Sequence, residues 1–117
     1  HIAYWQAVWT MGDGNDRPEL AQLPIHSPLL DHAFRYYTTQ VEAPVQKDLD
    51  PEAALQEVNR IHEAARAIAA GKAKDDVFPG QWGTWGVFVR YQAFHVAYHT
   101  GQAYSVRHLL GHATEDN

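Results

Sequence analysis

The chain has 117 residues, 45% of them hydrophobic, which is enough for one domain with its own apolar core. It contains no cysteine, which excludes disulfides, thiolate zinc sites and cysteine nucleophiles, so we expect a reducing, cytoplasmic location. A net charge of −5 without any basic cluster argues against nucleic acid as a partner, and no apolar run approaches the roughly 20 residues of a membrane span.

The first predicted helix covers residues 1–11, where large apolar residues recur at helical spacing and end at a polar, glycine-containing cluster. A second helix is predicted over residues 28–42. Ser27 can cap its first turn, Pro28 suits the first helical position, and Pro44 prevents its continuation.

Two further helices are predicted in the second half of the chain. Asp50 and Pro51 give a start signal, and Gly71 is the expected stop of this third helix. Its expected buried stripe is Leu55, Val58, Ile61, Ala65 and Ile68. Thr84 can cap a fourth helix that runs to Leu110. Its expected inner face includes Val87, Tyr91, Phe94, Tyr98 and Leu109.

No strand pattern is visible, because β-branched residues are scattered and no hairpin turn separates alternating runs. The sequence therefore predicts an all-α, up-and-down four-helix bundle that forms a single domain over residues 1–117. Such bundles place metal sites between facing helices.

His95 and His99 form the most informative motif of the chain. On a helix, residues four apart lie on one face with Cβ atoms about 5–6 Å apart, so both imidazoles can reach one ion. Another histidine, His1, opens the first predicted helix and is the candidate third ligand. Three such ligands leave a position open for water or substrate. The alternative is that the pair binds nothing, since any histidine-rich helix sometimes produces this spacing.

Residues around the pair suggest supporting roles. Gln102 lies one turn beyond His99 and could orient a ligand, and Gly101 suggests close approach of another helix or of a substrate. His32 is a reserve ligand. The tryptophans are expected to pack in the core and the loop rather than form a ligand cage. No Glu follows His95 as a zinc-protease helix requires, so a peptidase is a poor interpretation.

The segments His1–Gln6 and His95–Gln102 together resemble the DinB-like superfamily of metal-binding four-helix bundles. The resemblance implies a three-histidine site for a divalent ion such as Zn, Ni, Mn or Fe, with His1, His95 and His99 as ligands. Members of that family have a complete helix ahead of the first ligand. We therefore expect the natural protein to contain a further helix upstream of residue 1.

Two functions compete. The first, implied by the resemblance, is a metal-dependent enzyme, either an S-transferase that uses a low-molecular-weight thiol or a hydrolase, acting on a small-molecule substrate. The second is a non-catalytic bundle that dimerises or binds a small ligand. A homodimer is expected in either case, because the chain is rich in large apolar residues. A copper site built on a free amino terminus is a third alternative, which the helical pattern argues against.

Overall fold

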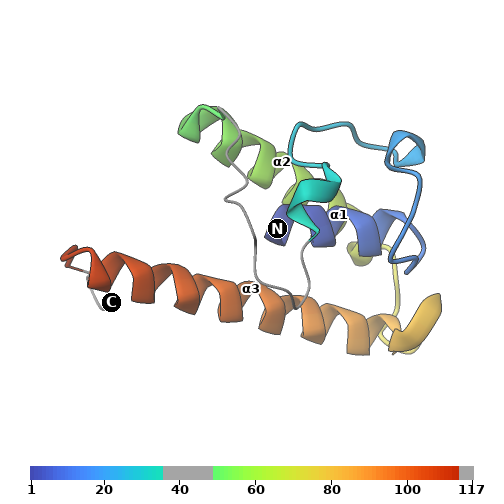
Figure 1. The fold of residues 1–117 in the computed structure, drawn as a ribbon. Coiled ribbons are helices and arrows are strands. Elements are labelled where there is room, and N and C mark those ends of the chain that lie inside the picture. Colours follow the sequence, from blue (N-terminus) through green and yellow to red (C-terminus); the bar gives the residue numbers. More distant parts are fainter. Residues whose placement is uncertain (36–48, 114–117) are drawn as a thin grey trace.

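The structure is a computed structural model that describes residues 1–35 and 49–113. The described residues are mostly helical, and their three α-helices are α1 (Ile2–Met11), α2 (Pro51–Ala70) and α3 (Trp85–Leu109). Figure 1 shows α1 next to α2, with the long α3 running past both and its C-terminal half extending beyond them. Within the described ranges, every helix is either too short or too polar to cross a membrane.

The first helix lies at the centre of the molecule. All eight residues from Ala3 to Thr10 are buried, so α1 is covered on every side. A helix that is largely apolar around its whole circumference is stable only when its neighbours enclose it.

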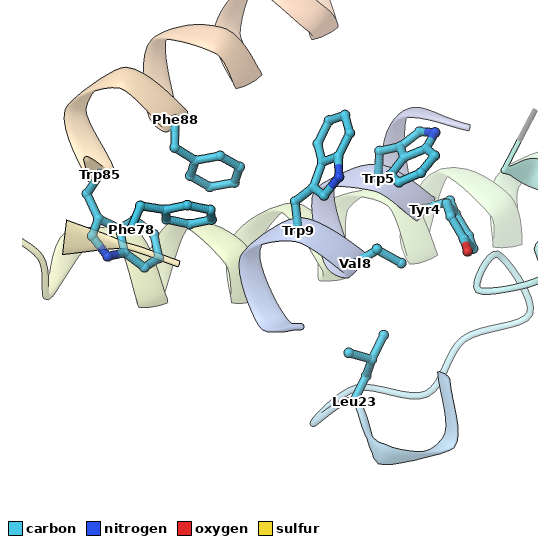
Figure 2. Packing of buried hydrophobic residues seen from close by; sticks show 8 residues of the cluster. All are labelled: Tyr4, Trp5, Val8, Trp9, Leu23, Phe78, Trp85 and Phe88. Carbon is cyan, nitrogen blue, oxygen red and sulfur yellow. The ribbon is translucent and has the colours of Figure 1, made fainter. Parts of the chain in front are cut away.

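The core has two parts, one on each side of α1. On one side, the ring of Trp9 packs against Tyr91 of α3, and Figure 2 shows Trp5 and Trp9 pointing to the same side of α1, whereas Tyr4 points away from them. On the other side, Ala3 and Ala7 pack against Ile61 of α2. Their short side chains let the two helices come close, which accounts for the complete burial of Ile61.

The predicted start signals of the two later helices are confirmed. The Asp50 carboxylate accepts a hydrogen bond from the Ala53 amide at 2.9 Å, and the Thr84 hydroxyl accepts one from the Val87 amide at 3.3 Å. The predicted stripe of α2 is correct at its centre, where Ile61 and Ala65 are buried. It is wrong at Leu55, which is 59% exposed.

The predicted helix over residues 28–42 is wrong where the structure describes it. Residues up to Arg35 form a turn and a 3-10 helix, His32–Phe34, and residues 36–42 lie outside the described residues. Ser27 accepts a hydrogen bond from the amide of Leu29, two residues on, and Asp31 does the same for Ala33. Such local bonds to the backbone favour turns over continuous helix.

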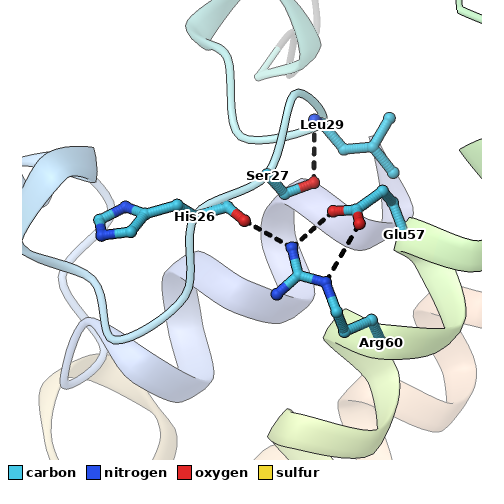
Figure 3. Close-up of polar contacts among 5 residues, drawn as sticks. All are labelled: His26, Ser27, Leu29, Glu57 and Arg60. Atoms are coloured by element: carbon cyan, nitrogen blue, oxygen red, sulfur yellow. Dashed lines mark hydrogen bonds and ion pairs between the residues drawn. The ribbon is translucent and has the colours of Figure 1, made fainter.

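This connecting segment is attached to α2 through Arg60. Its guanidinium donates to the Glu57 carboxylate and to the carbonyl of His26, as Figure 3 shows. The connection therefore follows a defined path between the end of α1 and Phe34, although it contains little regular structure.

A short hairpin precedes α3, which corrects the expectation that no strand is present. β1 (Val77–Phe78) pairs antiparallel with β2 (Gly83–Thr84), and a 3-10 helix, Gly80–Trp82, joins them. Two-residue strands are too short to give an alternating pattern, so the sequence carries no strand signal here. Gly14, at φ 71°, lies against Pro79, where a side chain would overlap the proline carbonyl. This contact connects the end of α1 to the hairpin.

The predicted inner face of α3 is correct at Tyr91, which packs against the core, and wrong at its other four residues. Phe94 is 60% exposed and Leu109 is 88% exposed, and Val87 and Tyr98 are exposed as well. The buried residues are instead Trp85, Phe88, Gln92 and His95. Apolar residues lie around the whole of α3, so spacing alone did not define which face meets α1.

We expect Phe78→Ala to lower the free energy of unfolding by about 3–5 kcal/mol. Phe78 is 2% exposed, stacks on Phe88 at 4.1 Å between ring centroids and packs edge-on against Trp85. Val77→Ala is the matched control, because Val77 is 82% exposed and its truncation should change stability by less than about 0.5 kcal/mol. Urea denaturation of the two variants measures this, and equal losses would contradict the described core.

Candidate metal centre

The structure brings His1, His95 and His99 together. Each offers one ring nitrogen, and these nitrogens all lie within 4.8 Å of one another. The ring centroids of His95 and His99 are 4.6 Å apart, as one-turn spacing on α3 requires. His1 lies 4.6 Å from His99 and 5.4 Å from His95 between ring centroids, although more than ninety residues separate it from either in sequence.

Aromatic side chains from both helices enclose the inner part of this cluster. Trp9 packs edge-on against His95 at 5.7 Å, and Tyr91 stacks on the same ring at 6.1 Å. His95 is therefore buried, whereas His1 and His99 are only half-buried. The cluster is closed on the side of the core and accessible on the side of His1 and His99.

Hydrogen bonds fix which nitrogen of two rings is available. The Nδ1 of His1 donates to the carbonyl of Phe34 at 3.0 Å, since a carbonyl can only accept. The Nδ1 of His99 donates to Oε1 of Gln102 at 2.6 Å, and the amide nitrogen of Gln102 donates to the Tyr98 hydroxyl. Nε2 in both rings then carries the free electron pair. Metal-binding histidines in proteins are held by the same kind of contact.

The donor set fits a divalent transition metal or zinc. Around a tetrahedral ion with bonds of about 2.0–2.1 Å, ligand nitrogens are about 3.3 Å apart. The nitrogens here lie within 4.8 Å, so side-chain movements of about 1 Å would bring them to that geometry. Three neutral imidazoles suit zinc, iron, nickel or copper better than the oxygen-preferring magnesium and calcium.

Burial also keeps His95 in the state that a metal requires. Desolvation, with a smaller contribution from neighbouring His99, lowers the pKa of His95 to about 4. At neutral pH its imidazole is therefore uncharged. A metal ion does not have to displace a proton from this ring.

The remaining predicted residues have mixed outcomes. Gln102 accepts a hydrogen bond from His99, and the tryptophans belong to the core or pack against it, as expected. His32 is not in the cluster; its Nδ1 lies 3.2 Å from the Tyr4 hydroxyl. Gly101 has no described neighbour within 4 Å of where a Cβ would be, so the expected close approach is absent from the described residues.

Two polar groups were not predicted from the sequence, the carbonyl that holds His1 and a buried glutamine on α3. The carbonyl of Phe34 is a backbone group in an irregular segment, and no side-chain pattern announces it. Gln92 is buried three residues before His95. Its position mirrors that of Gln102 three residues after His99, so the sequence did contain a signal for it.

Comparison with known proteins gives no identification. No protein family, no characterised protein and no solved structure matches this chain. The geometry of the three-histidine cluster is therefore the basis for a functional proposal.

We expect the metal-free protein to lose stability as the pH falls from about 6.5 toward 4. Unfolded His95 takes up a proton near the ordinary pKa of about 6.5, whereas folded His95 does so only near 4, so protonation favours unfolding between these values. The contribution of neutral His95 to the free energy of unfolding is fully present above pH 6.5 and amounts to at most about 3 kcal/mol.

Urea denaturation of chelator-treated wild-type protein and of His95→Gln, at a series of pH values, isolates this contribution. Carboxylates that titrate in the same range affect both proteins equally. The variant should show the shallower loss. The same pH dependence in both would contradict a neutral, buried His95.

Proposed function

We propose that the protein binds one divalent metal ion through Nε2 of His1, His95 and His99 and uses it as a metal-dependent enzyme. The observation that carries the proposal is the convergence of three imidazoles, one buried and two half-buried, from two helices. Bonds from Phe34 and Gln102 to two of the rings support it, because they orient the electron pairs that a metal would use.

The proposed reaction is a transfer to or from a small thiol, or a hydrolysis. A metal bound by three protein ligands lowers the pKa of a thiol or water at its open position. Because the chain has no cysteine, a thiol nucleophile would have to be a separate low-molecular-weight molecule. In this proposal, the half-buried side of His1 and His99 admits that molecule, and Trp9 and Tyr91 exclude water from behind His95.

We further propose that the described helices belong to a DinB-like four-helix bundle. An H-x3-H pair on α3 and a facing histidine at the start of α1 are the features in common. A groove of about 400 Å³, lined by all three helices and mainly by apolar side chains, gives additional support. A fourth helix of such a bundle would cover this groove.

Metal analysis of protein purified without an affinity tag tests the proposal. We expect about one equivalent of divalent metal per wild-type chain and less than about a tenth of that in a His95→Ala, His99→Ala double variant, since one ligand cannot hold the ion.

The matched control is a His108→Ala, His112→Ala double variant. It removes two exposed histidines with the same spacing, near the end of α3, and should keep its metal. Equal metal in all three proteins, or in none, would contradict the proposed site.

The second candidate is a non-catalytic homodimer that associates through α3. Large apolar residues remain exposed along this helix, including Phe94, Tyr98 and Leu109, and its C-terminal half extends away from α1 and α2 (Figure 1). Exposed apolar surface of this kind is typical of interfaces. The dimer is compatible with a metal site, but it requires none.

Light scattering at micromolar concentration decides the oligomeric state. We expect twice the chain mass of 13.2 kDa for the wild type. A Phe94→Ser, Leu109→Ser variant should shift toward the monomer, because it removes two of the most exposed apolar side chains of α3. A Leu55→Ser variant, which changes an exposed apolar residue of α2, is the control. A wild-type mass near 13.2 kDa would rule out the dimer.

A further inference from the structure

Gln92 and His95 contain the unpaired polar groups closest to the candidate metal centre. Nδ1 of His95 and both polar atoms of the Gln92 side chain are buried without a hydrogen-bond partner among the described residues. Gln92 is 8% exposed and His95 is 7% exposed. Polar groups buried in this way are costly unless they pair, so each of them needs an explanation.

Gln92 and His95 are three residues apart on α3. Residues three apart on a helix lie on the same face, within reach of one another. On the next turns of the same helix, His99 and Gln102 have this spacing, and there the imidazole donates to the carboxamide oxygen at 2.6 Å. The four residues form the pattern Q-x2-H-x3-H-x2-Q, in which each histidine has a glutamine three residues away on its outer side.

Each ring of the cluster needs a hydrogen-bond acceptor for its Nδ1 proton if its Nε2 is to bind the ion. His1 already has an acceptor for Nδ1 in the carbonyl of Phe34, and His99 has one in Gln102. Only His95 lacks one in the structure. An acceptor at Nδ1 fixes the proton there and leaves Nε2 for the ion, so a third acceptor would give all three rings the same tautomer.

We propose that Gln92 is the positioning residue of His95: its Oε1 accepts the Nδ1 proton of His95 when the ion binds, which directs Nε2 of His95 toward the ion. This inference rests on the proposed function. It adds a residue that acts through His95 and does not itself contact the metal. It also explains why a polar side chain occupies a buried position between Phe88 and His95 on α3.

Zinc affinity measured by chelator competition at pH 7.5 tests the inference. Gln92→Leu removes the acceptor but keeps the size of the side chain, and we expect its Kd to rise by about 10–100-fold. Gln92→Glu keeps an acceptor oxygen and should bind within a few-fold of the wild type. Gln56→Leu changes an exposed glutamine of α2 and is the matched control. Circular dichroism of the metal-free variants establishes that they are folded.

Nitrogen NMR of the zinc-loaded protein, labelled at histidine, provides a second readout. We expect His95 to carry its proton on Nδ1 and to bind zinc through Nε2. Zinc on Nδ1 of His95, an unchanged Kd in Gln92→Leu, or binding in Gln92→Glu as weak as in Gln92→Leu would overturn the inference while leaving the three-histidine site intact. A wild-type protein that binds no zinc would overturn the proposed function as well.

Discussion

The packing of Trp9 against α3 positions α1 relative to the helix that carries His95 and His99. Trp9 stacks on Trp5 at 4.5 Å, meets Tyr91 and His95 at 5.7 Å each, and donates its indole N–H to Asp16 at 2.7 Å. His1, Trp5 and Trp9 recur every four residues, so they share one face of α1. The position of Trp9 therefore determines where His1 lies, about 12 Å away along the helix.

A matching row of rings faces them from α3. Tyr91, His95 and His99 also recur every four residues, and the two rows meet in opposite directions, with Trp9 next to Tyr91 and His1 next to His99. At one end of this double row, Trp9 is buried against the half-buried Tyr91, and the other end consists of two half-buried imidazoles. The same packing that stabilises the core thus brings together the three candidate ligands and gives them one dry side and one accessible side.

The starts of two helices and the pairing of His95 with His99 could be predicted from local sequence patterns. The caps at Asp50 and Thr84 depend on nearest neighbours, and the H-x3-H spacing follows from helix geometry, so the sequence defines both. The approach of His1 to this pair depends on contacts between distant segments, so helix spacing made His1 a candidate ligand, and the family resemblance pointed to the same residue, but neither determined its position. The two wrong predictions, the helix over residues 28–42 and most of the inner face of α3, also have physical causes. Ser27 and Asp31 make hydrogen bonds within turns, and in the sequence such residues look the same as helix caps. Apolar residues lie around the whole of α3 and conceal which face meets α1.

X-ray absorption of the zinc-loaded wild-type protein tests the three-histidine centre, because it reports the ligands of the ion itself. We expect three imidazole nitrogens at about 2.0–2.1 Å, with the multiple scattering that imidazole rings produce, and at least one further light ligand at the open position. A bound ion surrounded mainly by carboxylate oxygens, with one imidazole or none, would contradict the three-histidine centre.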